Sequence, residues 1–248
     1  MENAKMFTHL VPIGFSPDKL IESIKQFPVH KIIILTHKGD EEQEMVQSAI
    51  KSIKKAFKGF EVENRVIERE SILESSLEML DIIEDEVKSG STVKINISGG
   101  LRNIGISAYI VSLVSDIMIY SDIPEYTDKE TYHLKGILDI PLFLIKDLAK
   151  EQLSILEKLE DGVESVDDLI SRLKPELEKG TTDFGNERSR LSHHIKKLSN
   201  AGFIKTEKVS KNLAIRKSKL GVIYMKGREI KRLTKERRYC KTNVPEIS

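Results

Sequence analysis

The sequence predicts an α/β protein of two domains: an N-terminal Rossmann-like parallel sheet, then a smaller and more basic C-terminal domain. Through about residue 140, β-branched apolar runs alternate with amphipathic helical segments. Short helices, an alternating hairpin and a last helix follow. The charge changes at the same place: residues 1–146 hold 17 Lys and Arg against 23 Asp and Glu, whereas residues 147–248 hold 23 against 16. We therefore expect domains at 1–140 and 141–236, with a basic tail at 237–248.

The composition excludes several classes of protein. Of the 248 residues, 39% are hydrophobic and 32% are charged, which suits folded domains and argues against disorder. Cys240 is the single cysteine, so an internal disulfide and a thiolate zinc site are both excluded. The N-terminus lacks the pattern of a signal peptide, and no apolar run approaches eighteen residues. A cytoplasmic location is expected.

The elements of the first domain follow from apolar periodicity. The run KIIILT at residues 31–36 is typical of a strand buried on both faces. Strands are expected at 6–13, 31–36, 62–67, 93–97 and 117–120, with one more at 132–134. Helices are expected at 18–27, 41–57, 72–87 and 103–115. Strands separated by helices predict parallel βαβ units with right-handed crossovers.

Three loops follow strands of this predicted sheet, and ligands bind where such loops gather. All three are rich in glycine, hydroxyl or basic residues, which suits a phosphate or nucleotide. The predicted ligand-binding residues are Gly14, Phe15 and Ser16, then Thr36, His37 and Lys38, then Ser98, Gly99, Gly100, Arg102 and Asn103.

The loop at residues 98–103 is the most informative of the three, because it follows a strand and opens a helix. Glycines allow close backbone approach, amides at a helix N-terminus attract phosphate, and Arg102 can add a charge-assisted contact. The loop is neither a GxGxxG fingerprint nor a Walker loop. A purely structural turn is the alternative.

In the second domain, residues 137–145 are expected to form a connector, interrupted by Pro141. Helices are expected at 148–159, from the cap Ser165 to about residue 173, and at 186–200. Residues 203–207 and 213–217 alternate and predict a hairpin. A last helix is expected at 222–235.

The predicted helix at 186–200 has an apolar stripe of Leu191, Ile195 and Leu198, and ends in Ala201-Gly202-Phe203-Ile204. This pattern resembles the recognition helix and first wing strand of winged helix-turn-helix regulators, whose polar side chains reach base edges in the major groove. The connection at 174–185 is longer than is usual in that family. The predicted DNA-binding residues are Arg188, Arg190, Ser192, His193, Lys196 and Lys197 on the helix, and Lys208, Lys211, Arg216 and Lys217 on the hairpin.

Charge favours duplex DNA as a partner, because residues 188–241 hold 18 basic against 3 acidic residues. Alternatives remain. The domain could serve protein contacts alone. Arg188 and His193 superficially match the Arg and His pair of a family of metal-independent ribonucleases, and His193 with His194 could be read as metal ligands. Neighbouring helical residues point about 100° apart, so no metal site is expected.

The stretch Asn96-Ile97-Ser98-Gly99-Gly100-Leu101-Arg102-Asn103 closely resembles the Asn-hydrophobic-Thr-Gly-Gly-Thr-Arg motif of CARF domains, the CRISPR-associated Rossmann folds. The whole chain resembles CARF/winged-helix transcription regulators of archaeal CRISPR systems. The resemblance implies a homodimer whose sensor domains form one pocket for a cyclic oligoadenylate, usually the tetra-adenylate, with roles for the 14–16 loop and for Ser98, Gly99, Gly100, Arg102 and Asn103. Thr36, His37 and Lys38 are added from their place at a strand end. Ser98 and Leu101 depart from the motif.

The sequence therefore predicts a dimeric regulator that binds cyclic oligoadenylate and duplex DNA, with no cofactor and no catalytic residue. A ring nuclease or ribonuclease effector is the alternative, as is a regulator of an ordinary metabolite. Asp122, Glu125 and Asp128 could bind a cation but are better read as solvated surface, and Tyr109 and Tyr120 as core.

Overall fold

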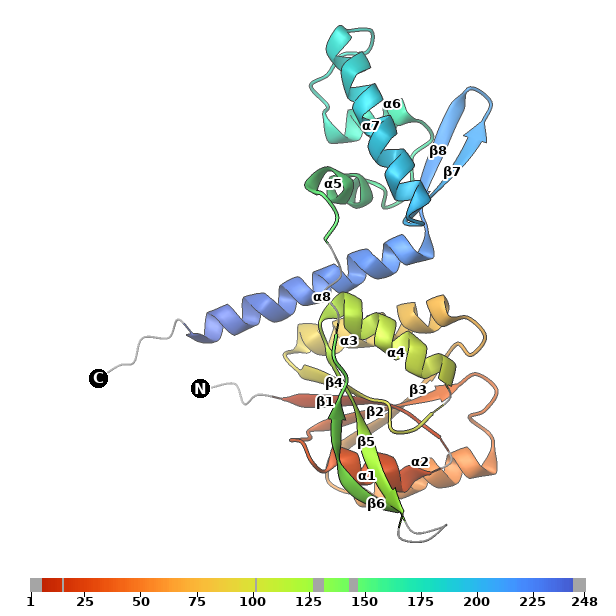
Figure 1. The fold of residues 1–248 in the computed structure, drawn as a ribbon, viewed down its shortest axis with the longest axis vertical. Helices are drawn as coiled ribbons and strands as arrows, with labels where there is room; N and C mark the ends of the chain where they lie inside the picture. Colours follow the sequence, from red (N-terminus) through yellow and green to blue (C-terminus); the bar gives the residue numbers. More distant parts are fainter. Residues whose placement is uncertain (1–5, 15, 101, 127–131, 143–146, 243–248) are drawn as a thin grey trace, which may run out of the picture. The chain divides into compact units, whose positions relative to one another are not determined.

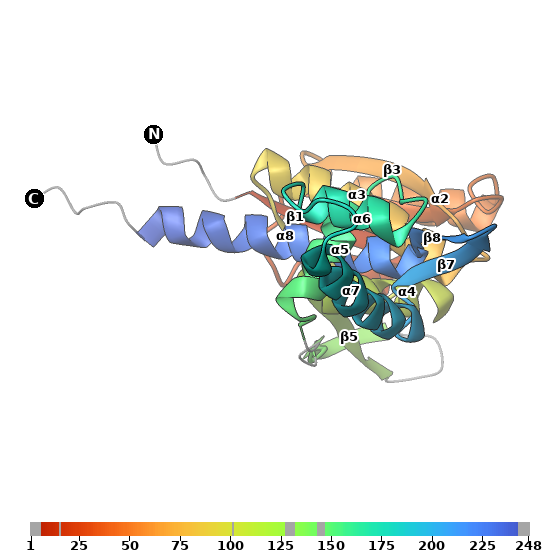
Figure 2. The ribbon, with the colours of Figure 1, turned by 90° about the horizontal axis from the view of Figure 1, so that it is seen from above.

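The computed structural model describes residues 6–14, 16–100, 102–126, 132–142 and 147–242, the side chains of 237–242 excepted. The chain divides into two compact units (Figures 1 and 2). Unit 1 comprises residues 1–144 and 227–248, and unit 2 comprises residues 145–226. This division differs from the predicted one in grouping residues 227–236 with the first unit.

Unit 1 contains a mainly parallel sheet of six strands in the order β3-β2-β1-β4-β5-β6. Neighbouring strands from β3 to β5 run parallel, as predicted. The sixth strand is antiparallel to β5, which corrects the prediction of a fully parallel sheet. The strands are β1 (Phe7–Pro12), β2 (Lys31–His37), β3 (Glu61–Ile67), β4 (Thr92–Asn96), β5 (Met118–Tyr126) and β6 (Tyr132–Asp139).

Two helices cover each face of this sheet (Figure 1). The face of α1 and α2 is packed with apolar side chains that include Leu20, Ile32 and Ile53, all fully buried. On the other face Ser71 caps α3 by accepting a hydrogen bond from the Glu74 N–H, and Gly90 ends that helix in the left-handed region. The helices are α1 (Pro17–Ile24), α2 (Glu44–Ala56), α3 (Ile72–Ser89) and α4 (Arg102–Ser115).

The edge of the sheet at β5 and β6 differs most from the sequence prediction. The strand expected at 117–120 extends to Tyr126, through Pro124 and a register shift. Its partner extends to Asp139, so the first part of the expected connector belongs to the sheet. Proline is tolerated at such an edge and bulge, and a chain reversal without a helix makes the pair antiparallel.

Unit 2 contains three helices followed by a hairpin and the start of the last helix. Leu156, Leu169, Leu198 and Ile215 are all fully buried in its core. The hairpin projects from the end of α7 (Figures 1 and 2), and Val163 pairs with Ile215 in an antiparallel bridge. The elements are α5 (Lys150–Lys158), α6 (Val166–Leu173), α7 (Thr182–Asn200), β7 (Ile204–Val209), β8 (Asn212–Lys217) and α8 (Lys219–Thr242).

The predicted helix starts in unit 2 were right for α6 and wrong for α7. Ser165 caps α6 as expected, accepting a 3.0 Å hydrogen bond from the Asp168 N–H. The α7 helix begins at Thr182, four residues before the predicted start, with Thr181 as its cap. The connection from α6 is therefore only residues 174–181, which is shorter than the sequence indicated. Likewise α8 continues to Thr242, so the expected basic tail is partly helical.

Within the described residues, no helix is long and apolar enough to span a membrane.

Candidate functional site

The strand order reverses between β1 and β4, which lie side by side although β2 and β3 intervene in sequence. From β1 the chain proceeds outward through β2 and β3, and then returns to β4 on the other side. The helices that follow these two strands, α1 and α4, consequently lie on opposite faces of the sheet (Figure 1). Such a switch point leaves a crevice at the carboxyl ends of the strands. It is the position in this sheet best suited to a ligand.

Glycines allow the two loops at this point to touch. A Cβ on Gly14 would lie 2.8 Å from the Gly100 backbone nitrogen, closer than real contacts allow. A Cβ on Gly100 would lie 2.8 Å from the Pro12 Cβ, and Gly100 has a φ of +88°. Both positions therefore require glycine, for close approach and for backbone conformation respectively.

A buried hydrogen-bond network holds the second loop in place. The Asn96 side-chain amide donates to the Ser23 hydroxyl (2.8 Å), and the Ser98 N–H donates to the Asn96 side-chain oxygen (2.8 Å). The Ser98 hydroxyl donates to Ser23 (3.2 Å) and accepts from the Asp122 N–H (2.8 Å). Because its bonds are already made within the protein, Ser98 shapes the loop rather than offering a free hydroxyl.

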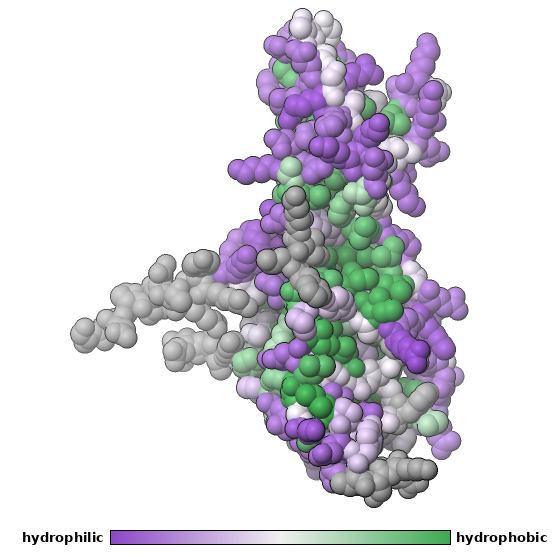
Figure 3. Space-filling model, in the orientation of Figure 1, coloured by the Kyte–Doolittle hydropathy of each residue, from purple (hydrophilic) through white to green (hydrophobic). Residues whose placement is uncertain are grey.

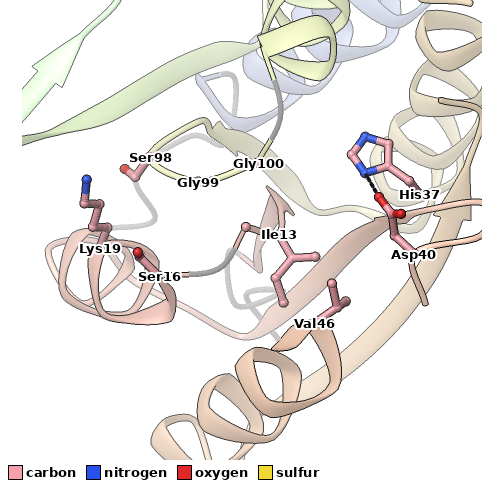
Figure 4. A pocket seen from close by; sticks show the side chains of 10 residues that line it. Ile13, Ser16, Lys19, His37, Asp40, Val46, Ser98, Gly99 and Gly100 are labelled. Carbon is pink, nitrogen blue, oxygen red and sulfur yellow. Dashed lines mark ion pairs between the residues drawn. The ribbon is translucent and has the colours of Figure 1, made fainter. Parts of the chain in front are cut away.

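The two loops, the end of β2 and the starts of α1 and α2 line an open cavity of about 230 Å³ (Figure 4). Six predicted ligand-binding residues line it, together with four that were not predicted. The predicted ones are Gly14, Ser16, His37, Ser98, Gly99 and Gly100. The additional ones are Ile13, Lys19, Asp40 and Val46. Lys19 and Asp40 could have been suspected, since each follows a predicted loop by three residues or fewer.

The other predicted ligand residues lie outside this lining. Thr36 is fully buried in β2, where its hydroxyl bonds the Asn64 side chain and the Arg65 carbonyl, so its placement in a loop was wrong. Lys38 is exposed after β2, and Asn103 bonds the Arg69 carbonyl. Arg102 is exposed at the first residue of α4, so its contact with a ligand stays a prediction. Phe15 lies outside the described residues.

The β2 end of the cavity holds a histidine next to a carboxylate. His37 is 3% exposed, and its Nδ1 lies 3.5 Å from Asp40 Oδ2. Asp40 also pairs with Arg69 at 2.8 Å and accepts from the Gln43 side chain at 2.6 Å. Burial lowers the pKa of His37 from its ordinary value, Asp40 opposes that shift, and Arg69 adds to it. The imidazole is therefore neutral near pH 7.

The anion-binding features lie at the opposite end. Lys19 is half-buried in the first turn of α1, and Ser16 at the start of that helix makes no side-chain cap. The uncapped first-turn amides and the ammonium both favour a negative group. Across the described part of the chain, no three His, Cys, Asp or Glu side chains are grouped to hold a metal ion.

In unit 2 the predicted DNA-binding residues of α7 form two groups. Two arginines are held in ion pairs, and the other residues are exposed. Arg190 pairs with the buried Glu187 at 2.8 Å, and Arg188 lies 3.4 Å from Asp167. Lys196 and His193 are exposed on the face opposite the buried stripe.

The remaining predicted DNA-binding residues are mostly exposed as well. Ser192 and Lys197 of α7 are exposed, as are Lys208, Lys211 and Arg216 of the hairpin, whereas Lys217 is partly buried. The same outward face of α7 also carries Ser189 and Asn200, which the sequence reading missed.

Glu187 is a buried acidic residue of α7. It is 6% exposed and is bound by Arg190 through two nitrogens and by Lys174 at 3.0 Å. Its hydrogen bond with Arg190, and then that with Lys174, holds the pKa of its carboxyl below the ordinary value. Arg190 is thus held against its own helix.

Sequence comparison finds a matching family model and a relative. Residues 7–127 match the family described as HFX_2341_N:-like, N-terminal. A protein of Archaeoglobus fulgidus described as an uncharacterized protein is 25% identical over 224 residues, which cover 88% of this chain and 97% of that protein.

Three solved structures are similar in part. They are Csm6 of Enterococcus italicus bound to cyclic hexa-2′-fluoro-hexa-dAMP, Can2 of Sulfobacillus thermosulfidooxidans in complex with cyclic tetra-adenylate, and protein VC1899 of Vibrio cholerae. Identities are 11, 14 and 13%, and TM-scores are 0.40, 0.39 and 0.39. The matches cover 79, 96 and 94% of this chain, and 55, 67 and 68% of those chains. This chain therefore spans little more than half the length of Csm6.

Proposed function

We propose that this chain is a homodimeric, CRISPR-associated transcription regulator. In this proposal unit 1 binds a cyclic oligoadenylate, cyclic tetra-adenylate in the first instance, and unit 2 binds duplex DNA as a winged helix-turn-helix. The observation that carries the proposal is the switch-point cavity, where Gly14 and Gly100 bring backbone amides together beside Lys19. The resemblance of residues 96–103 to the CARF motif supplies the class of ligand.

The size of the cavity supports a dimer. Pockets for whole drug-sized ligands are usually about 300–1,000 Å³, and this one is about 230 Å³. A ring of four nucleotides exceeds that volume, so one chain can hold only part of it. Two copies related by a two-fold axis would each supply half of the site.

An exposed apolar surface offers a place for the second copy. Figure 3 shows apolar side chains gathered on the face that carries α4 and the β5–β6 pair. On these elements Ile106 and Leu138 are each 50% exposed, and Ile123 is 38% exposed. Contiguous apolar patches of this kind commonly mark protein interfaces. The α4 helix also starts at the Gly99-Gly100 loop, so an interface along it would adjoin the cavity.

The order of elements in unit 2 supports DNA binding. Three helices precede a two-stranded hairpin, and the third helix turns into the hairpin at Gly202. Exposed cations lie along α7 and the hairpin, which suits phosphate contacts. Within this proposal, cytoplasmic location and the absence of a cofactor are expected as well.

Calorimetry on the purified chain tests the ligand. Cyclic tetra-adenylate should bind at micromolar concentration or tighter, and cyclic hexa-adenylate serves as the comparison ring. If neither ring binds, the ligand assignment is wrong. DNA affinity measured with and without the ligand should change, and the ligand's affinity must change by the same factor when DNA is present.

Light scattering tests the dimer. The chain should have twice the monomer mass, and replacing Ile106 and Leu138 together with lysine should give monomers. Met45 on α2 is 60% exposed, and Met45→Lys is the matched control that should remain dimeric. A wild-type chain that is monomeric at micromolar concentration would remove the two-fold site.

A further inference from the structure

Strand β5 extends beyond its parallel neighbour β4, at the edge of the sheet where the cavity lies. The pairing of the two strands ends at Asn96 and Tyr120, so residues 121–126 continue past the carboxyl end of β4. There they pair with β6 as an antiparallel ribbon. The Asp122 N–H donates to the Ser98 hydroxyl at 2.8 Å, which joins the ribbon to a loop that lines the cavity. The ribbon therefore adjoins the cavity.

The last residue of β5 is an exposed tyrosine. Tyr126 is 52% exposed. Its ring meets the ring of its cross-strand partner Tyr132 in a T-shaped contact, with the centroids 6.4 Å apart. Such edge-to-face contacts are favourable, so the second ring supports the first. An aromatic ring that is both supported and exposed is suited to stacking.

Lys19 connects this ring to the cavity. Its side chain lines the cavity, and its ammonium lies 5.6 Å from the centroid of the Tyr126 ring, a cation–π distance. The ammonium and Tyr132 together leave about half of Tyr126 uncovered. One sugar separates the base of a nucleotide from its phosphate. An ammonium and a ring this close can therefore contact the two parts of one nucleotide.

The size of the cavity implies that part of the ligand lies outside it. At about 230 Å³ the cavity can hold only part of a cyclic tetra-adenylate, so at least some bases extend beyond its lining. Every base has a π face that stacks on aromatic side chains. A base whose phosphate is bound by Lys19 is within reach of Tyr126.

We infer that Tyr126 stacks on a purine base of the ligand, next to a phosphate bound at Lys19. This inference rests on the proposed function and deepens it, because it assigns a base-binding position beside the cavity. Tyr126 was not among the ligand residues that the sequence predicted.

Calorimetry with cyclic tetra-adenylate on two variants tests the stacking. Tyr126→Ala should bind about 5- to 150-fold more weakly than the wild type, because stacking on an aromatic side chain contributes about 1–3 kcal/mol per base. Tyr126→Phe keeps the ring and should bind like the wild type. Thermal unfolding and light scattering should show both variants folded and in the same oligomeric state as the wild type.

A tryptophan reporter shows whether a base lies on the ring itself. The natural sequence has no tryptophan, so Tyr126→Trp introduces a single fluorophore, and a stacked adenine should quench its emission. Phe60→Trp is the matched control. Phe60 is 49% exposed and precedes β3, at the opposite edge of the sheet, so its replacement should report no change when the ligand is added.

The failures are distinguishable. If the wild-type chain binds cyclic tetra-adenylate but Tyr126→Ala binds it equally well, the inference is overturned and the proposed function stands. It is overturned too if the ligand leaves the emission of Tyr126→Trp unchanged, or if Tyr126→Ala loses affinity only by becoming monomeric. If the wild-type chain does not bind cyclic tetra-adenylate, the proposed function and the inference fall together.

Discussion

The cavity of unit 1 and the basic surface of unit 2 handle charge in opposite ways. In the cavity the described lining has a single ammonium, Lys19, and a carboxylate that already pairs with Arg69, so the proposed recognition would depend mainly on backbone geometry. On α7 and the hairpin the cations are numerous and exposed. We therefore expect ligand binding in the cavity to be sensitive to a single added methyl group, and DNA binding by the basic surface to be sensitive to salt.

The largest expected difference between the two regions is in salt dependence. If six to ten phosphates are contacted, DNA affinity should fall by roughly 10³–10⁵ between about 50 and 200 mM salt, because each contact releases a counterion. Ligand affinity should fall much less, since partly buried charges are screened less. Anisotropy titrations with labelled duplex, and calorimetry with the ligand, measure both. If DNA affinity and ligand affinity depended equally on salt, the two regions would not differ in how they use charge.

We expect the addition of one methyl group to the cavity wall to reduce ligand affinity. Gly14→Ala places a Cβ 2.8 Å from the Gly100 nitrogen and forces the two loops apart. We expect overpacking of about 1–3 kcal/mol to appear largely as lost ligand affinity, about 5- to 150-fold. DNA affinity measured without ligand should not change.

Gly105→Ala is the matched control, because a Cβ there meets nothing within 4 Å on α4. Alanine should stabilise that helix by up to about 1 kcal/mol and leave ligand binding intact. Comparable losses of ligand affinity in both variants would show that helix α4, rather than loop contact, controls the site.

Among the described residues of unit 2, Glu187 is the one buried charge, and removing it should lower the stability of the fold. Glu187→Gln should lower the free energy of unfolding by about 1–3 kcal/mol at pH 7, because Arg190 and Lys174 lose their partner. The native pKa of Glu187 is depressed, so its contribution is complete above the ordinary glutamate value and is lost as pH falls through the native value.

Urea unfolding of the full chain at pH 7 and below pH 4 measures this contribution. The wild-type chain should lose more stability across that interval than Glu187→Gln does. Glu176→Gln, at an exposed position, is the control and should behave like the wild type. A variant whose acid sensitivity matches that of the wild type would mean that the ion pairs of Glu187 contribute nothing.

The smallest effects should distinguish the cations of α7 from one another. Lys196→Ala should weaken binding to all duplexes a few-fold and reduce the slope of log affinity against log salt by about 1. Arg188→Ala should change the slope less, because its guanidinium already lies 3.4 Å from Asp167. Salt titrations of both variants on one duplex give the comparison. A larger slope change for Arg188→Ala would reverse this ranking.

Much of the fold could be predicted because local periodicity reports burial. The predicted strand at 31–36 is a buried strand, the predicted alternation of strands and helices forms a mainly parallel sheet, and Ser165 caps α6 as predicted. Strand β5 (Met118–Tyr126) was predicted to end at residue 120, because Asp122 and Glu125 were interpreted as solvated surface. The edge of the sheet tolerates Pro124 and extends the strand beyond it. The start of α7 was missed because residues 182–185 contain Gly185, a poor helix former, although Thr181 caps them.

The sequence by itself determined that Gly14 and the residue 98–103 loop would lie at strand ends, because a strand followed by a glycine and a helix is readable locally. Only the tertiary structure decided which loops meet. The strand order places β1 beside β4, so that Gly14 contacts Gly100 and Lys19 and Asp40 line the same cavity. It also left Thr36 in the core and Arg102 outside the cavity. Such pairings depend on contacts between residues far apart in the chain, which no local pattern records.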